Sequence, residues 1–329
     1  MVKPPSAHHS KGGLTLAVLG CGTLATAILS GILSSISENA SASTSGSDAS
    51  AEDLPTRTPT RFIACVTRPE SAQRVKRELS HLTSSTITLT VFENENVRAS
   101  QEADVVMLGC KPYHLTTVLG AQGMQGALQG KLLISILAGV SVGQMEDALY
   151  SAGSASHGED DDRCKLVRVM PNTAALIRES MSVIAKPDPP LPPDLQKLVS
   201  WMFARVGQVR TVPASQMDVC TALCGSGPAM FAMVLEAIAD GAVAMGLPRA
   251  DAQLMAAQTM RGASSLVLNG EHPAMVREKV STPGGCTIGG LLVLEERGLR
   301  GTVARGLREA TVVASQLGEG KQGVNGTRF

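Results

Sequence analysis

Short apolar runs that alternate with helix-like stretches dominate the sequence from Leu14 to about Val212. Each run is apolar throughout rather than at every second position, which is typical of parallel strands covered by helices on both faces of a sheet. The strand-like runs are LTLAVLG, RFIACVT, ADVVMLGC, KLLISILAG, KLVRVMP and MSVIAK. Strands that alternate with helices along a chain predict a doubly wound, Rossmann-like α/β domain over 14–212.

The composition narrows the class of protein further. The chain has 329 residues, of which 43% are hydrophobic and 18% charged, and its formal net charge is zero. This balance argues against a nucleic-acid or anionic-membrane surface, because both require a local excess of Lys and Arg. The N-terminus lacks the apolar core of a signal peptide, and no uncharged apolar run reaches about 18 residues. We therefore expect a cytoplasmic protein with no nucleic-acid or membrane partner.

The cysteines predict neither a disulfide framework nor a metal site. Their number is odd, no CxxC pair occurs, and most lie in apolar or glycine-rich stretches, so we expect reduced, small core residues. No HExxH motif or matching Cys/His set accompanies them, so no metal is expected. The seven are Cys21, Cys65, Cys110, Cys164, Cys220, Cys224 and Cys286.

Composition shifts divide the chain further. Residues 38–56 and 151–163 are rich in Ser, Ala, Gly and acidic residues, and we expect them to be mobile surface insertions. Residues 213–316 consist of long stretches rich in Ala, Met and Leu, which predict an all-helical second domain. Residues 1–13 and 317–329 are predicted to be flexible tails.

The helical region has more apolar surface than one copy can bury. The stretch AMFAMVLEAIADGAVAM is apolar over more than one face, and a helix that is apolar all round must be enclosed. We therefore expect this domain to pair with a second copy of itself in a homodimer.

A glycine pattern follows the first apolar run directly. In LAVLGCGTLATAI, Gly20, Gly22 and Ala25 form GxGxxA between a predicted strand and a predicted helix. Gly20 permits a tight turn, Gly22 allows a pyrophosphate to approach the helix N-terminus, and Ala25 allows close packing of helix on sheet. This context predicts a dinucleotide site, with a purely structural turn as the alternative.

The end of the second run bears on which dinucleotide binds. NAD sites usually place an acid there for the ribose hydroxyls, but RFIACVTRPES offers Thr67 and Arg68, with Glu70 beyond the proline. An arginine suits a 2′-phosphate, so the sequence favours NADPH, with NADH possible. Lys111, in CKP after a later run, lies at the edge where such folds bind ligands; it is either a surface lysine or a residue near cofactor or substrate.

These motifs together resemble fungal-type pyrroline-5-carboxylate reductase with insertions. Beyond the glycine pattern, the resemblance rests on CKP (110–112), RVMPNTAALIRES (168–180), TALCGSGPA (221–229), DGAVAMGLPR (240–249), AAQTMRGAS (256–264) and GEHPAMVREKVSTPGGCTIGGLLVLEERG (270–298). It spans nearly the whole chain except the tails and the insertions. It implies a Rossmann domain followed by a helical dimerisation domain, and further assembly into a ring such as a decamer.

The resemblance also implies a set of cofactor residues. We expect them to contact NADPH, with residues 170–172 on the nicotinamide side; Asn96 competes with Asn94 for its role. The set is Gly20, Gly22, Thr23, Leu24, Thr67, Arg68, Asn96, Cys110, Lys111, Pro112, Met170, Pro171 and Asn172.

The resemblance assigns substrate to the stretch VSTPGGCTIGG (280–290), which interrupts a helical region. The N–H groups around Gly284, Gly285 and Cys286 would converge on the substrate carboxylate at the start of a helix near Ile288. Ser281 belongs to the same loop. As catalytic residues, Thr282 and Thr287 would bond the carboxylate and the ring nitrogen with their hydroxyls.

The implied reaction is NAD(P)H-dependent reduction of 1-pyrroline-5-carboxylate to L-proline, the last step of proline biosynthesis. A six-membered cyclic imine stays open as substrate, because sequence does not fix a pocket to one methylene. Two rivals are a 3-hydroxy-acid dehydrogenase, for which Lys279 is the only lysine between 213 and 316, and a non-catalytic NADP-binding sensor. His272 is expected to start a helix rather than to catalyse.

Overall fold

The computed structural model describes residues 13–41, 54–150, 162–321 and 324. Most of the predicted tails and insertions lie outside these residues. The chain divides into two compact units, Met1–Gly225 with Val313–Asn325 and Ser226–Val312 with Gly326–Phe329.

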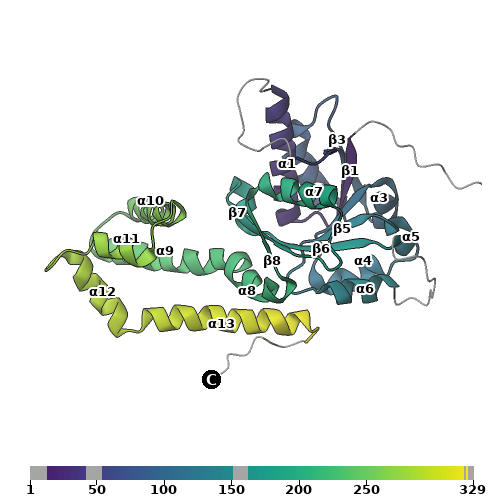
Figure 1. Cartoon of the computed structure of the whole chain (residues 1–329). Coiled ribbons are helices and arrows are strands. Elements are labelled where there is room, and N and C mark those ends of the chain that lie inside the picture. Colours follow the sequence, from purple (N-terminus) through teal and green to yellow (C-terminus); the bar gives the residue numbers. More distant parts are fainter. Residues whose placement is uncertain (1–12, 42–53, 151–161, 322–323, 325–329) are drawn as a thin grey trace, which may run out of the picture. The chain divides into compact units, whose positions relative to one another are not determined.

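The first unit is built on an eight-stranded sheet in the order β3-β2-β1-β4-β5-β6-β7-β8 (Figure 1). Strands β1 to β6 are parallel to one another, as the apolar runs predict. The strands are β1 (Leu14–Leu19), β2 (Pro59–Val66), β3 (Thr88–Glu93), β4 (Val105–Leu108), β5 (Leu132–Ser135), β6 (Lys165–Met170), β7 (Ser180–Ala185) and β8 (Gly207–Val212). The expectation of a doubly wound α/β domain is confirmed.

The last two strands depart from the parallel arrangement. β7 pairs antiparallel with β6, and β8 runs parallel to β7. Only residues 171–179 connect β6 to β7, and part of this connection is a short 3-10 helix, Thr173–Ile177. A parallel crossover needs a dozen residues or more, so this connection permits only a reversal of direction.

The apolar runs in the sequence did not predict the two edge strands, β3 and β8. β3 reads TLTVFE, with only Phe92 buried, and β8 reads GQVRTV with no buried residue. An edge strand has only one neighbouring strand and is more exposed than a central one, so it carries no continuous apolar run.

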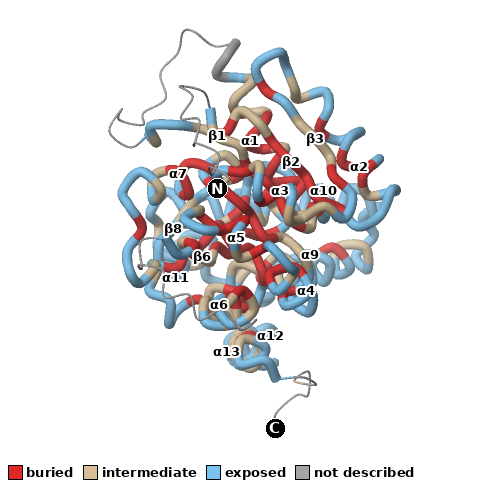
Figure 2. Tube along the Cα trace, turned by 90° about the vertical axis from the view of Figure 1, so that its right-hand side faces the viewer, coloured by how far each residue is buried: buried red, intermediate tan, exposed pale blue. Residues whose placement is uncertain are grey.

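Helices cover both faces of the sheet, as Figure 2 shows by the buried residues between them. One core lies between the sheet and α1 (Thr23–Ser41), α2 (Pro69–Leu79) and α7 (Pro193–Ala204). The other lies under α3 (Asn96–Glu102), α4 (Leu115–Leu119), α5 (Met124–Leu128) and α6 (Val142–Tyr150). This layering explains why the strand runs are apolar at every position.

The ends of the first predicted insertion belong to ordered structure. Helix α1 continues to Ser41, and the Glu38 carboxylate accepts two hydrogen bonds from Arg178, at 2.9 and 3.1 Å. On the far side, the backbone N–H of Thr56 donates to the Asp194 carboxylate at 2.8 Å. These ends thus make hydrogen-bonded contacts with the sheet unit, and the expected mobility of the insertions stays a prediction.

Helix α13 (Leu299–Gly318) extends beyond the predicted start of the C-terminal tail at residue 317. The first unit also contains α8 (Met217–Cys220) and a π-helix, Thr221–Gly225. Residues 213–225 and 313–325 thus group with the first unit. The boundary at 212/213 remains a sequence prediction.

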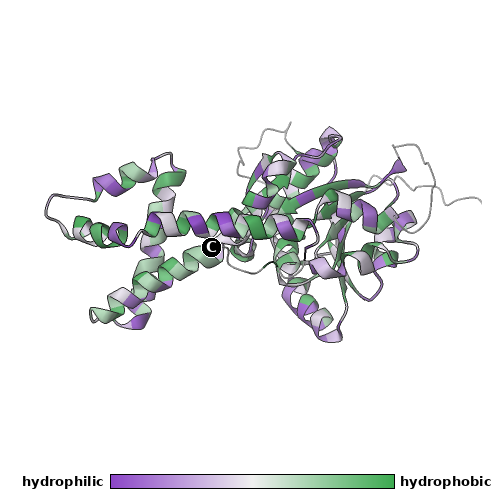
Figure 3. Cartoon of the chain, turned by 90° about the horizontal axis from the view of Figure 1, so that it is seen from below, coloured by the Kyte–Doolittle hydropathy of each residue, from purple (hydrophilic) through white to green (hydrophobic). Residues whose placement is uncertain are grey.

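The second unit is helical. It contains α9 (Gly227–Ala244), α10 (Arg249–Leu268), α11 (Pro273–Lys279), α12 (Cys286–Glu296) and the first part of α13. α9 packs against α10, and α10 against α11. Few residues here are buried, and Figure 3 shows hydrophobic residues along these helices. Phe231 is 61% exposed, Met233 64% and Leu254 70%, which fits the expectation that another surface covers them.

One stretch, Ala214–Ala244, is long and apolar enough to cross a membrane by length and composition alone. The stretch has 31 residues, and an 18-residue window within it has a mean hydropathy of 1.5. No membrane span was expected from the sequence, because that expectation considered only apolar runs without charged residues. A single helix of this kind is weak evidence for a membrane, since apolar helices of soluble proteins have the same composition.

All seven cysteines carry free thiols, as expected. Cys286, which lies at the start of α12, is exposed and is therefore not a core residue. Within the described residues, no group of three or more His, Cys, Asp and Glu side chains could hold a metal ion.

Candidate cofactor and substrate sites

The glycine turn lies where the chain order of the sheet reverses, between β1 and β4. Gly20 has φ +81°, and a Cβ added to it would lie 2.6 Å from the backbone N of Cys110. The N–H of Gly109 donates to the carbonyl of Leu19 at 2.8 Å, which joins the two strand ends. Doubly wound folds bind ligands at such a reversal point, outside the carboxyl ends of the strands.

Gly22 and Ala25 fit the parts expected of them. A Cβ on Gly22 would meet no atom within 4 Å, so open space lies in front of the helix start. Ala25 is 1% exposed, and its Cβ lies 3.2 Å from where a Cβ on Gly109 would be. α1 starts at Thr23, directly after the turn, and the first N–H groups of a helix lack intrahelical partners. The turn therefore offers N–H donors beside an open space, which suits a pyrophosphate.

The ends of β2 and β3 meet beside this turn. The N–H groups of Gly20 and Cys21 donate to the carbonyl of Cys65 at 3.2 and 2.8 Å. Thr67 and Arg68 follow β2, are exposed, and Arg68 forms the N-cap of α2. The structure thus brings the predicted phosphate-binding residues to the same edge as the glycine turn.

The structure separates the two asparagines that the sequence left in competition. Asn94 has φ +57°, and its side-chain amide donates to the carbonyl of Thr67 at 3.3 Å. Asn96 is the first residue of α3, and its carbonyl accepts the hydroxyl of Ser100 at 2.9 Å. Asn94 is therefore the asparagine that supports the β2 loop.

Arg74 of α2 also reaches the glycine turn, and sequence reasoning missed it. Its guanidinium donates to the hydroxyl of Thr23 at 3.3 Å and to the carbonyl of Cys21 at 3.4 Å. In the sequence it is one of several charged residues in QRVKRE, so nothing marks it out before the packing of α2 against α1 is known.

Cys110, Lys111 and Pro112 leave the sheet at the end of β4, beside the glycine turn. Burial raises the pKa of the Cys110 thiol to about 11. The thiol is therefore neutral near pH 7 and is no nucleophile, while its backbone packs on Gly20. Lys111 is exposed and precedes a 3-10 turn, Pro112–His114.

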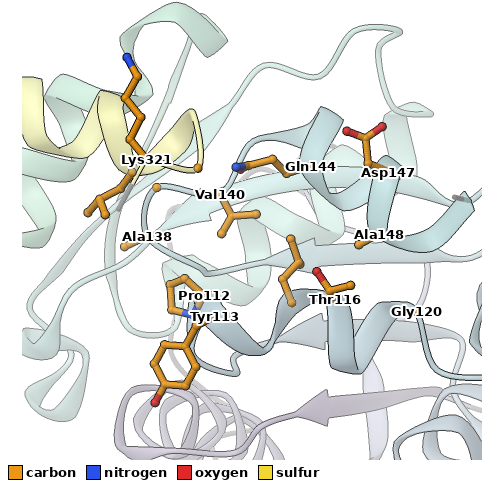
Figure 4. A pocket seen from close by; sticks show the side chains of 14 residues that line it. Pro112, Tyr113, Thr116, Gly120, Ala138, Val140, Gln144, Asp147, Ala148 and Lys321 are labelled. Carbon is orange, nitrogen blue, oxygen red and sulfur yellow. The ribbon is translucent and has the colours of Figure 1, made fainter. Parts of the chain in front are cut away.

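A cavity of about 940 Å³ opens next to Pro112 (Figure 4). Its walls come from the segments after β4 and β5, from α6, and from the last residues of α13 and Lys321. Pro112 is the only predicted cofactor residue among its lining residues, and the glycine turn is absent from them. We therefore place the cofactor on the glycine turn and not in this cavity.

Met170, Pro171 and Asn172 are all buried at the end of β6. The side chain of Asn172 donates to the carbonyl of Cys224 in the π-helix at 3.0 Å and accepts the N–H of Ala174 at 3.0 Å. Its backbone N–H donates to the hydroxyl of Ser180 at 3.1 Å. Asn172 thus ties β6 to the π-helix, whereas its predicted cofactor contact stays a prediction.

The loop at 281–285 forms a tight turn before α12. The N–H of Gly285 donates to the carbonyl of Thr282 at 3.0 Å, with Pro283 and Gly284 between them. Gly284 has φ +69°, which is the conformation that a type II turn requires after its proline. A Cβ on Gly285 would lie 2.5 Å from the hydroxyl oxygen of Thr282, so the turn has no room for a larger residue.

Two details of the predicted anion site need correction, the N–H of Gly285 and the start of the helix, while the predicted role of Ser281 stays a prediction. The N–H of Gly285 is bonded to Thr282, so it is not available to a substrate carboxylate. The hydroxyl of Ser281 donates to the carbonyl of Arg277 at 2.8 Å and closes the preceding helix. α12 begins at Cys286, not near Ile288, so the unpaired N–H groups are those of Cys286 and the next residues.

Two neighbours of the loop have structural contacts. Lys279 forms an ion pair with Glu271 at 2.7 Å. The ring of His272 accepts the N–H of Ala274 at 3.2 Å and caps α11, as expected of a helix-start residue. The predicted cofactor residues lie in the first compact unit, and the predicted substrate residues lie in the second.

Two family profiles match the chain. One, described as pyrroline-5-carboxylate reductase dimerisation, matches residues 214–317. The other, described as NADP oxidoreductase coenzyme F420-dependent, matches residues 15–139. The first profile covers the helical region, and the second covers the glycine turn and the first five strands.

Similar proteins match over almost the whole chain. A pyrroline-5-carboxylate reductase of Lophium arboricola is 57% identical over 316 residues, which are 96% of this chain and 97% of the relative. The chain belongs to the pyrroline-5-carboxylate reductase family. A pyrroline-5-carboxylate reductase of Neurospora crassa is 52% identical over an alignment of 332 positions, which covers 97% of this chain and 98% of the relative.

A solved structure supports the fold of the pyrroline-5-carboxylate reductase family for this chain. The crystal structure of Plasmodium falciparum pyrroline carboxylate reductase with NADP bound aligns with a TM-score of 0.71. The sequences are 22% identical, and the alignment covers 94% of this chain and all of the other. At this identity the likeness concerns the fold.

Proposed function

We propose that this protein reduces 1-pyrroline-5-carboxylate to L-proline with NADPH, the final step of proline biosynthesis. The observation that carries the proposal is the 57% identity to a pyrroline-5-carboxylate reductase over 96% of the chain. The turn after β1 and the turn before α12 add physical support, because each presents helix N-terminal N–H groups of a kind that binds anions.

The first unit suits NADPH. The open space at Gly22 and the N–H groups at the start of α1 would hold the pyrophosphate. Arg68, exposed at the N-cap of α2, offers a guanidinium for the 2′-phosphate. The NADP named for the Plasmodium falciparum structure agrees with this choice.

The second unit supplies the substrate residues in the proposal. The N–H groups of Cys286 and Thr287 at the start of α12 would bind the substrate carboxylate, with the hydroxyl of Thr282 beside them. The hydroxyl of Thr287 would hold the ring nitrogen. Gly284 and Gly285 keep the turn tight enough for this approach.

The bound cofactor would supply a hydride to the carbon of the C=N bond. The protein's task is then to orient the imine and to keep its nitrogen protonated, because a protonated imine already accepts a hydride readily. A hydroxyl at the ring nitrogen, such as that of Thr287, meets this need without a strong acid. The absence of a His/Asp pair from the predicted site is consistent with such chemistry.

The rival hydroxy-acid dehydrogenase has little support in the structure. It would need a catalytic lysine in the helical domain, and the only lysine between 213 and 316, Lys279, is paired with Glu271. A sensor without activity would have no need of the tight turn before α12.

The reaction is tested by following the loss of NADPH absorbance with racemic 1-pyrroline-5-carboxylate. NADH in place of NADPH tests cofactor choice, and the six-membered cyclic imine tests ring size. We expect rapid oxidation with the five-membered ring. Protein that binds NADPH but oxidises it with neither imine would contradict the proposal and favour the sensor.

Two variants test the proposed site. We expect Thr287→Val to reduce kcat at least about tenfold, because a lost hydrogen bond to a charged group costs about 1.5–3 kcal/mol. Gly285→Val should act mainly on KM, since its side chain would collide with Thr282. Thr302→Val is a matched control, because the Thr302 hydroxyl donates to the carbonyl of Gly298, directly before α13. Full activity in both site variants would refute the site.

The proposal includes self-association and a cytoplasmic location. The profile match at 214–317 and the exposed side chains of α9 and α10 support a homodimer, and assembly into a larger ring such as a decamer extends it. Light scattering at micromolar concentration measures the mass, and a monomer would contradict self-association. Fluorescence microscopy of a tagged full-length chain tests the location and the expectation of no membrane partner.

A further inference from the structure

Arg74 points its guanidinium at the glycine turn rather than at its neighbours on α2. Glu70 and Glu78 lie four residues before and after it, at the spacing where helical side chains usually pair. Among the ion pairs of the described residues, none joins Arg74 to either glutamate. Its guanidinium instead donates to the neutral Cys21 carbonyl and Thr23 hydroxyl, at 3.4 and 3.3 Å.

The guanidinium has donors to spare. It carries five N–H groups, of which two donate to Cys21 and Thr23. Its Nε is buried without a hydrogen-bond partner in the described part of the chain and is out of a ligand's reach, so the donors left for an anion are on the two terminal nitrogens. By contrast, Arg61 of β2 and Arg98 of α3 both form ion pairs with Glu102.

The position of Arg74 suggests which anion it serves. α2 begins directly after β2, at the strand end where a doubly wound fold places the adenosine ribose. Arg68 is the N-cap of this helix. Arg74 lies further along the helix, and its guanidinium contacts the glycine turn. A phosphate bound by both arginines would lie beside the glycine turn, whereas the pyrophosphate would lie over the N–H groups at the start of α1.

We infer that Arg74 is a specificity-determining residue that binds the ribose 2′-phosphate together with Arg68. This inference rests on the proposed use of NADPH and adds a residue that lies outside the sequence motifs. The guanidinium is pre-oriented by Cys21 and Thr23, so little side-chain entropy is lost when the phosphate binds. NADH, which lacks this phosphate, would gain nothing from Arg74.

The test is calorimetric titration of the full-length protein and its Arg74→Met variant with NADPH and with NADH. We expect the variant to raise the Kd for NADPH about 10- to 100-fold, the effect of losing one or two hydrogen bonds to a charged group. The Kd for NADH should change by less than about threefold. Titration with 2′,5′-ADP should reproduce the loss, because this fragment carries the 2′-phosphate without the nicotinamide.

Arg77→Met is the matched control, since Arg77 lies on the same helix and is exposed. Arg74→Lys keeps the charge and should retain part of the preference for NADPH, which guards against loss through misfolding. Equal losses for NADPH and NADH would overturn the inference, and so would an unchanged Kd for NADPH. Wild-type protein that prefers NADPH but reduces no imine would defeat the proposed function and leave this inference standing.

Discussion

At the scale of single residues, the two glycines of the turn after β1 have different physical tasks. Gly20 has a positive φ, and the backbone of Cys110 lies so close that a Cβ on Gly20 would collide with it. Gly22 faces open space instead. The first glycine is therefore needed by the fold, and the second by the ligand.

Alanine substitutions should separate these tasks. We expect Gly20→Ala to lower the free energy of unfolding by about 2–4 kcal/mol, through the positive φ and the contact with Cys110. Gly22→Ala should change it by less than about 0.5 kcal/mol but weaken NADPH binding, because its methyl group would enter the space for the pyrophosphate. Urea unfolding and calorimetric titration measure the two effects. Equal stability of both variants would contradict the assignment.

Asn172 is a second residue whose task the structure clarifies. We expect Asn172→Ala to lower the free energy of unfolding by about 1–3 kcal/mol, because the carbonyl of Cys224 and the N–H of Ala174 lose their partner. Asn269→Ala, at the exposed end of α10, serves as the control in the same urea titration. An unchanged stability with a raised Kd for NADPH would show instead that the side chain contacts the cofactor.

At the scale of elements, charged side chains join α3 to β2. Glu102 at the end of α3 accepts hydrogen bonds from Arg61 of β2 and, at 3.1 Å, from Arg98. The hydrogen bond from Arg61 is the main cause that lowers the pKa of Glu102 below its ordinary value of 4.5. These groups are partly exposed, so the stabilisation is modest.

The lowered pKa predicts how stability depends on pH. A carboxylate whose pKa is lower in the folded state stabilises the fold above its unfolded pKa and loses this effect as pH falls through the folded value. We expect Glu102→Gln to cost about 0.2–1 kcal/mol at pH 7 and to reduce the loss of stability below about pH 4.5. Thermal unfolding from pH 7 to pH 3 measures this, with Glu93→Gln as the exposed control. Parallel curves for wild type and Glu102→Gln would argue against the network.

At the scale of the whole molecule, the two units differ in how much apolar surface they bury. The sheet unit encloses two cores between its layers. The helical unit leaves Phe231, Met233 and Leu254 more than half exposed in a single chain. Exposed apolar surface of this extent marks an interaction site, and the match to a dimerisation profile fits this.

A charge placed on this surface should therefore prevent self-association. We expect Phe231→Asp to shift the protein to smaller species by light scattering and to lower its melting temperature, since assembly stabilises the folded state. Leu54→Asp is the control, because Leu54 is 47% exposed in the other unit. An unchanged mass for Phe231→Asp would exclude this face of α9 from the interface.

The amino-acid sequence alone predicts the α/β class, the strands that are apolar throughout, the glycine turn and the helical second region. These features depend on local patterns, such as strand runs, GxGxxA and the pair Pro283–Gly284, which act over a few neighbouring residues. The family resemblance, carried by long ordered motifs, added the candidate substrate loop, and the similar proteins confirmed the family.

The other features could not be predicted from the sequence, because they depend on contacts between residues far apart in the chain. The short β6–β7 connection reverses the sheet direction, and the edge strands β3 and β8 carry no distinctive pattern. Arg74 lies 51 residues from Thr23 in sequence, and Asn172 lies 52 residues from Cys224. A local pattern depends on residues that are neighbours in the sequence. A contact formed by packing joins distant residues, so the sequence beside either residue does not predict it.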